Sequence, residues 1–129
     1  MTQMHEKILS KVDTARFMKA SQWSFNQTWN GKVDISVWLR ASMAQGGRVY
    51  MLLEYTDQNK KYSVPVDRCM TPSSEAHLLN GRVNIVGRGA LRDLQIKIKY
   101  EGCDPQGFVV EEISLRAIQD KAQVATRAA

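Results

Sequence analysis

The chain has 129 residues, of which 43% are hydrophobic and 24% are charged, and its formal net charge is +5. This length and composition predict one domain with a single core, and they exclude extensive disorder. The apolar runs are far shorter than the roughly 18 residues of a membrane helix, and charged side chains interrupt the N-terminal segment that a signal peptide would use. We therefore expect one domain over residues 1–129, located in the cytoplasm and without membrane contact.

Local periodicity divides the first 25 residues into two predicted elements. A helix is predicted within residues 1–14 from apolar residues at helical spacing, which are Met4, Ile8, Leu9 and Val12. Residues 16–25 place Phe17, Trp23 and Phe25 on one side of an extended chain, which predicts a strand.

The middle of the chain alternates apolar and polar residues with the period of two that is typical of strands. Strands are predicted at residues 32–40, 48–55 and 61–66, and the polar turn between the last two makes them a hairpin. Pro65 has no N–H to donate, so we expect the third of these strands at the edge of a sheet. A short helix is also expected within residues 73–79.

The C-terminal half continues this alternation in residues 93–100 and 108–118. In the second of these strands the pattern shifts by one residue at Glu111 and Glu112, which indicates a β-bulge. Residues 119–129 are expected to form a frayed tail or a short helix. About seven short strands separated by turns predict an all-β protein: a mainly antiparallel β-sandwich or partly open barrel with a short N-terminal helix.

Two segments of the sequence resemble each other, NGKVDI at residues 30–35 and NGRVNI at residues 80–85. Because Asn-Gly is a favoured hairpin turn, each segment is predicted to be a turn that leads into a strand. Two interpretations stay open. The segments are either copies of one duplicated β-meander with loops of different length, or two unrelated turns followed by ordinary strand sequence.

Few residues in the chain could support catalysis. Its two cysteines, Cys69 and Cys103, have no C-x-x-C spacing, which predicts two reduced thiols. Cys69 and His77 would act as nucleophile and base only with an orienting third group and an oxyanion site, and the sequence identifies neither. Metal-ligand spacings and phosphate-binding loop motifs are also missing from the sequence. We therefore expect no enzyme activity, no metal and no cofactor.

The positive charge is concentrated in one part of the chain. Residues 82–99 contain five basic residues and one acidic residue, which favours an anionic partner. Trp38 is predicted on the polar side of its strand, where an exposed indole forgoes apolar burial. Aromatic rings beside cations can stack on bases while the cations neutralise phosphates.

These observations lead to two hypotheses about function. The predicted ligand-binding residues are Trp38, Arg40, Tyr50, Arg88, Lys97 and Lys99. The first hypothesis is a non-catalytic binding or adaptor module that binds an anionic ligand, a nucleic acid or a nucleotide, on a basic and aromatic sheet face. The alternative is a protein-interaction or assembly module that forms homo-oligomers or docks a partner through the same face. A carbohydrate-stacking role ranks lower because such modules usually go with secretion, and the same residues also fit an ordinary solvated strand face.

Overall fold

Alternating apolar and polar residues along the chain build two antiparallel sheets that pack face to face. The computed structural model describes residues 4–21, 23, 25, 28–41, 43–70, 75–104 and 106–118. In these residues one helix and seven strands form a β-sandwich, which confirms the predicted fold class. The elements are β1 (His5–Lys11), α1 (Thr14–Ser21), β2 (Trp29–Arg40), β3 (Met43–Asp57), β4 (Lys60–Met70), β5 (His77–Gly87), β6 (Leu91–Cys103) and β7 (Val109–Ile118).

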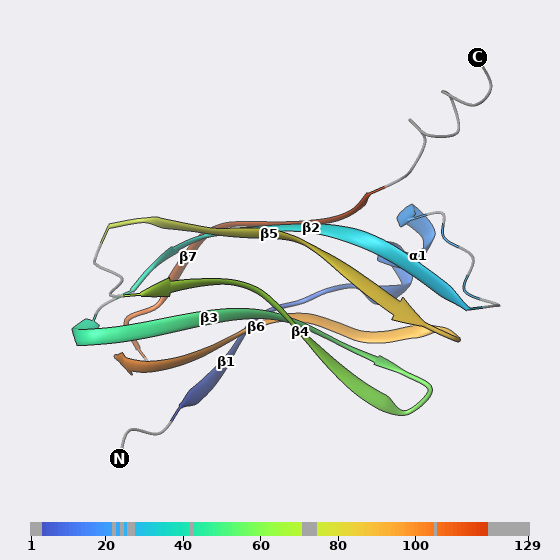
Figure 1. The fold of residues 1–129 in the computed structure, drawn as a ribbon. Helices are drawn as coiled ribbons and strands as arrows, with labels where there is room; N and C mark the ends of the chain where they lie inside the picture. Colours follow the sequence, from blue (N-terminus) through green and yellow to red (C-terminus); the bar gives the residue numbers. More distant parts are fainter. Residues whose placement is uncertain are drawn as a thin grey trace.

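The strands are divided between two layers. Sheet A has the strand order β1-β6-β3-β4 and sheet B the order β5-β2-β7, with every neighbouring pair antiparallel. Figure 1 shows sheet B as the upper layer and sheet A as the lower layer. The edge position of β4 confirms the prediction from Pro65. The register of β7 on β2 shifts at Glu111, which confirms the predicted bulge.

The core lies between the two sheets and is supplied mainly by one face of three long strands. Its central residues are Val33, Ile35, Val37 and Leu39 from β2, Val49, Met51, Leu53 and Tyr55 from β3, and Leu94, Ile96, Ile98 and Tyr100 from β6. These are the positions that the alternating pattern places on the inward face. The intervening residues therefore form the two outer faces of the sandwich.

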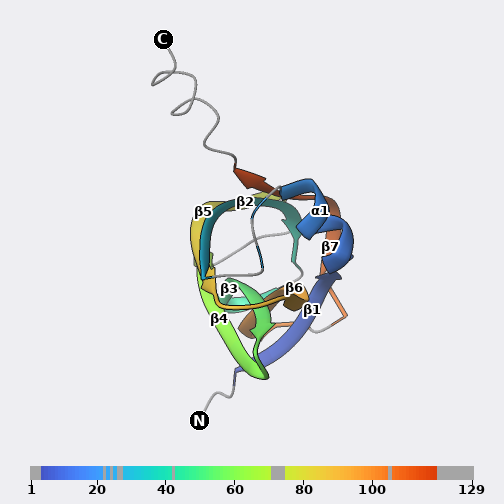
Figure 2. The same cartoon turned by 90° about the vertical axis from the view of Figure 1, so that its right-hand side faces the viewer.

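The two sides of the sandwich are closed in different ways. On one side β4 and β5 run next to each other, and a Cβ atom on Gly81 would lie 2.7 Å from the carbonyl oxygen of Val66. On the other side α1 packs against β6 and β7 and buries Phe17 in the core. Figure 2 shows this arrangement end-on, with β4 and β5 on one side and α1 on the other. No helix in the described ranges is long and apolar enough to cross a membrane.

The N-terminal helix predicted within residues 1–14 is wrong over the part that the structure describes. His5–Lys11 form β1, which pairs with β6, and the helix follows this strand. Asp13 is the N-cap of α1: its Oδ1 accepts a hydrogen bond from Arg16 N at 3.1 Å and its carbonyl oxygen accepts one from Phe17 N at 2.9 Å. The cap therefore sets the start of the helix, which the apolar spacing alone misplaced.

Two other local predictions also differ from the structure. The strand expected from residue 16 is wrong over residues 16–21, which belong to α1. The helix expected within residues 73–79 is wrong at His77–Leu79, which begin β5, and residues 73–74 lie outside the described part of the chain. The tail predicted at residues 119–129 also lies outside it.

The two Asn-Gly segments are not turns, so that prediction is wrong. Residues 30–35 lie in β2 and residues 80–85 lie in β5, and the two segments pair with each other so that each glycine stands opposite the isoleucine of the other. A Cβ atom on Gly31 would lie 2.2 Å from the ring of Trp23, and the glycine thus lets this ring approach the strand. The two glycines thus allow close approach of groups outside the β2–β5 pair, the Trp23 ring at Gly31 and Val66 of β4 at Gly81.

Candidate ligand site

The six residues predicted to bind a ligand lie in three separate places. Trp38 and Arg40 are on the outer face of sheet B, Tyr50, Lys97 and Lys99 are on the outer face of sheet A, and Arg88 follows β5 at the end of the sandwich. The expectation of one shared face is wrong because β2 and β6 belong to different sheets. Trp38 and Arg88 also lie at opposite ends of the β2–β5 pair.

Most of the predicted cations already have carboxylate partners. Arg40 forms an ion pair with Glu111 on the neighbouring strand. Lys99 Nζ lies 3.8 Å from Glu6 Oε1 on β1. In the described residues the guanidinium of Arg88 forms no ion pair and no hydrogen bond, although its backbone N–H does. Of the predicted cations, Arg88 is therefore the most available to an anionic ligand.

Lys97 belongs to a buried charge network on sheet A. Its Nζ lies 2.9 Å from Glu6 Oε2 and 3.3 Å from Glu54 Oε2, and Gln95 Nε2 donates to Glu54 Oε1 at 2.9 Å. Burial by itself would raise the pKa of Glu54, but the hydrogen bonds from Gln95 and Lys97 outweigh it and the pKa is lowered. The hydrogen bond to Glu6, and then the one to Glu54, raises the pKa of Lys97 against the cost of burial. Lys97 therefore has a structural role, because its ammonium group is already paired with two carboxylates and is not available to a ligand.

The end of the sandwich beside Arg88 is built by two turns. Gln58 and Asn59 have φ values of 50° and 65°, as in the two-residue turns that match the twist of a hairpin, and they connect β3 to β4. At the end of β3, Asp57 Oδ2 accepts a hydrogen bond from Arg88 N at 3.0 Å and Oδ1 accepts one from Gly89 N at 2.9 Å. The buried carboxylate of Asp57 thus fixes the β5–β6 turn against the β3–β4 turn, and both its oxygens are occupied.

Two aromatic side chains support this end from the core side. Trp29 Nε1 donates to the carbonyl oxygen of Gly89 at 2.7 Å. The Tyr55 hydroxyl donates to the carbonyl oxygen of Val86 at 2.8 Å and accepts from Val86 N at 3.1 Å. Burial raises the pKa of Tyr55, so the hydroxyl keeps the proton that it donates. A Cβ atom on Gly87 would lie 2.3 Å from the Trp29 ring, so Trp29 packs directly on the backbone of β5.

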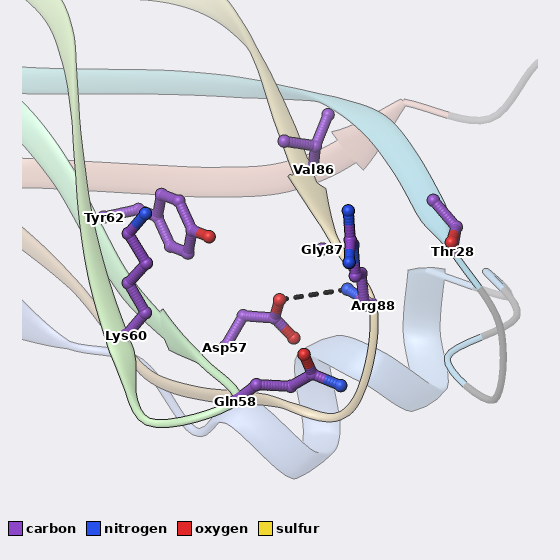
Figure 3. A pocket seen from close by; sticks show the side chains of 8 residues that line it. All are labelled: Thr28, Asp57, Gln58, Lys60, Tyr62, Val86, Gly87 and Arg88. Carbon is purple, nitrogen blue, oxygen red and sulfur yellow. Dashed lines mark hydrogen bonds between the residues drawn. The ribbon is translucent and has the colours of Figure 1, made fainter.

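These elements surround a pocket of about 550 Å³, which we call the end pocket. Figure 3 shows Lys60 and Tyr62 from β4 on one wall, Gly87 and Arg88 on the opposite wall, and Asp57 between them. Its lining residues are Thr28, Asp57, Gln58, Lys60, Tyr62, Val86, Gly87 and Arg88. The end pocket combines two cations, an aromatic ring and polar side chains, which can hold an anion attached to a flat or apolar group.

The Tyr62 ring in the end pocket is held in place from behind. It stacks on Tyr55 with ring centroids 5.2 Å apart and an interplanar angle of 19°, and Lys60 Nζ lies 5.4 Å from its centroid. Lys60 and Tyr62 were not predicted as site residues. The consecutive lysines at 60 and 61 were a signal of charge at this turn, but their closeness to Arg88 depends on the pairing of distant strands.

The thiol and histidine that were considered for catalysis do not have the environment of an activated pair. Cys69 is partly buried on β4 and packs against the core. Burial, and then the nearby carboxylate of Asp67, raises the pKa of the Cys69 thiol, whereas a nucleophilic cysteine needs a lowered pKa. In the described ranges no group of three or more His, Cys, Asp or Glu side chains is placed to hold a metal ion.

Comparison with known proteins gives no family for this sequence. No family model matches it, and no curated protein matches it. Solved structures do match the fold. One is an N-terminal fragment of Clostridium thermocellum endo-1,4-β-D-xylanase 10B, its CBM22-1 and GH10 modules complexed with xylohexaose; its TM-score is 0.53, with 8% sequence identity over 70% of this chain. The chain spans 17% of the length of that structure.

Two further solved structures are similar at lower scores. The CBM22-1 xylan-binding domain of Paenibacillus barcinonensis xylanase 10C has a TM-score of 0.49 and 12% identity, covering 92% of this chain and 85% of the domain. The Eiger TNF structure from S. frugiperda has a TM-score of 0.45 and 12% identity, covering 91% of this chain and 86% of its own. The xylanase structure, with its TM-score of 0.53, shares the fold of this chain. At 8% identity this likeness supports a β-sandwich and no particular ligand.

Proposed function

We propose that the protein is a non-catalytic binding module that holds a small anionic ligand, such as a nucleotide, in the end pocket. One observation carries the proposal: Lys60 and Arg88 line the same pocket, and neither side chain has a carboxylate partner within the described part of the chain. The carboxylate of the pocket, Asp57, is buried and already bound by two backbone N–H groups. A phosphate or carboxylate would therefore meet two positive charges against the single negative charge of Asp57, whose two oxygens accept hydrogen bonds from backbone N–H groups.

The size and lining of the end pocket fit a ligand larger than a bare anion. Its volume of about 550 Å³ lies in the usual range of small-molecule sites, roughly 300–1,000 Å³. Tyr62 adds an aromatic ring and a hydroxyl to the lining, with Lys60 Nζ over the ring. Thr28 and Gln58 supply polar groups at the rim. A nucleotide combines a phosphate with a flat ring and is thus the ligand class that uses the whole lining.

A neutral sugar is the main competing ligand class. The xylanase structure with the similar fold is complexed with xylohexaose. Binding of a neutral oligosaccharide relies on ring stacking and hydroxyl hydrogen bonds, so it would change little with ionic strength. The two cations that face the end pocket favour an anion instead.

A cytoplasmic location of the protein stays a prediction.

Calorimetric titration separates these ligand classes. We expect adenosine monophosphate to bind at low salt, and to bind several-fold more weakly when the salt concentration rises from about 50 to about 300 mM. Arg88→Gln should weaken binding about tenfold, the equivalent of about 1.4 kcal/mol. Arg68→Gln removes a positive charge from the outer face of sheet A and should leave the affinity for adenosine monophosphate unchanged. Binding of xylohexaose that depends on neither salt nor Arg88 would contradict the proposal.

The outer face of sheet B supports a second candidate function, assembly or docking of a partner. Trp38 is 40% exposed and Leu78 is 41% exposed, and the two residues pair directly across β2 and β5. Tryptophan is enriched in protein interfaces compared with the remaining surface, and adjoining exposed apolar side chains mark interaction sites. This candidate concerns a surface remote from the end pocket, so both functions can be tested independently.

A further inference from the structure

A second hollow lies on the outer face of sheet A. It is formed by the parts of β3 and β4 that lie farther from the β3–β4 turn than the end pocket does. It has a volume of about 620 Å³ and an apolar floor of Leu52, Pro65 and Val66, with Met4 at its margin. We call it the sheet A groove. Of the residues predicted from the sequence to bind a ligand, Tyr50 and Lys99 line this groove.

A row of three side chains crosses one end of the groove. Tyr50 on β3 pairs with Arg68 on β4 and with Lys99 on β6, so a cation stands on each side of the tyrosine. Because neighbouring strands are about 4.8 Å apart, the backbones of the two cations are about 10 Å apart. One small anionic group above Tyr50 lies within reach of both long side chains.

The polar groups of this row are available to a ligand. In the described residues the guanidinium of Arg68 and the hydroxyl of Tyr50 form no hydrogen bond or ion pair. Lys99 has a single long ion pair, 3.8 Å to Glu6, and its side chain is 43% exposed. The carboxylate at the groove, Asp67, accepts hydrogen bonds from Arg68 N at 2.8 Å and from Asn80 N at 2.9 Å. Its two oxygens are therefore engaged with backbone N–H groups.

The next row of paired residues in sheet A presents mainly apolar surface to the groove. It consists of Lys97 on β6, Leu52 on β3 and Pro65 on β4. The ammonium of Lys97 is held by Glu54 and Glu6, so the groove is left with the apolar surface of Leu52 and Pro65. The groove thus has a cationic end beside an apolar floor.

From this arrangement we infer that the sheet A groove binds an anionic amphiphile, a single long-chain carboxylate of the fatty-acid type. The carboxylate lies between Arg68 and Lys99 and accepts a hydrogen bond from the Tyr50 hydroxyl. The alkyl chain lies over Leu52, Pro65 and Val66, where its burial removes apolar surface of both partners from water. Charge complementarity fixes the head, and the apolar floor selects a chain over a short anion.

Titration calorimetry with three probes below their micelle concentrations tests the inference. Decanoate should bind, while acetate, which lacks the chain, and decanol, which lacks the charge, should each bind at least tenfold more weakly. The double variant Arg68→Gln/Lys99→Gln should weaken decanoate binding at least tenfold and leave decanol binding unchanged. Both substituted residues are exposed or half-exposed, so the fold should persist, which circular dichroism checks. Lys32→Gln, which removes an exposed positive charge from the outer face of sheet B, is the matched control and should bind decanoate like the unchanged protein.

Four results would overturn the inference. The first is absence of decanoate binding, and the second is decanoate binding that the double variant retains. The third is a single-stranded oligonucleotide that binds more tightly than decanoate and loses affinity in Tyr50→Ala, because the row would then be a base-stacking surface. Attachment of the protein to anionic lipid vesicles without binding of monomeric decanoate would overturn it as well.

Discussion

At the scale of single residues, two glycines beside the end pocket have different roles. A Cβ atom on Gly87 would lie 2.3 Å from the Trp29 ring and 3.0 Å from Asp57 Cγ, whereas one on Gly89 would have its nearest neighbour at 3.6 Å. Gly87→Ala should therefore displace Trp29 and lower the free energy of unfolding by about 1–3 kcal/mol. Gly89→Ala should leave it unchanged or raise it by up to about 1 kcal/mol. Urea unfolding measures both, and equal effects of the two substitutions would show that Trp29 does not constrain β5.

For single residues, the sequence predicted exposure better than it predicted which cations are available to a ligand. Trp38 was predicted to be exposed, and it is. Whether a cation is free depends on partners far away in the sequence, such as Glu111 for Arg40 and Glu54 for Lys97. No local pattern distinguishes these paired cations from Arg88. The tertiary contacts decide which positive charges remain for a ligand.

At the scale of elements, the charge network of Glu54 connects β3 with β6 and with the edge strand β1. The pKa of Glu54 is lowered below its ordinary value of 4.5, so the folded state binds a proton at Glu54 less readily than the unfolded chain does. The stability that Glu54 contributes is thus present above about pH 4.5 and is lost as the pH falls through the lower folded pKa.

Glu54→Gln tests this linkage. It should lower the free energy of unfolding by about 1–3 kcal/mol at neutral pH, because the carboxylate accepts hydrogen bonds from a charged partner. The difference from the unchanged protein should shrink as the pH falls below 4.5 and through the lowered pKa of Glu54, where the carboxylate itself becomes protonated. Urea unfolding at several pH values measures the difference. Glu112→Gln, on the outer face of sheet B, is the control, and a pH-independent loss in Glu54→Gln would contradict the account.

The elements themselves were predictable where packing follows the alternating pattern. The central inward residues of β2, β3 and β6 were identified in this way, because burial of one sheet face imposes a period of two. Trp29 and Leu91, which are also in the core, were missed because β2 and β6 begin earlier than the predicted strands. The pattern failed at the N-terminus, where Asp13 caps α1 and β1 is an edge strand with few buried residues. It failed again at Asn30 and Asn80, where the glycines that follow lie inside β2 and β5 and allow the close approach of Trp23 and Val66.

At the scale of the whole molecule, the sandwich has two outer faces with different chemistry. The face of sheet B carries the exposed pair Trp38 and Leu78. If that face assembles copies of the chain, sedimentation should show a dimer that Trp38→Ser converts to monomer without loss of fold. Val86→Ser is the matched control, because Val86 is exposed on the same sheet nearer the end pocket. A monomer at all concentrations would contradict self-assembly through this face.

We propose that a nucleotide binds in the end pocket, and not on the outer face of either sheet. The most direct test is a titration of isotope-labelled protein with adenosine monophosphate, followed by the NMR signals of the backbone amides. The account predicts that the largest changes occur at the pocket-lining residues Gln58, Lys60 and Arg88 and at the neighbouring Gly89. Changes confined to the indole of Trp38 and its neighbours on sheet B, with no change at Arg88, would contradict it.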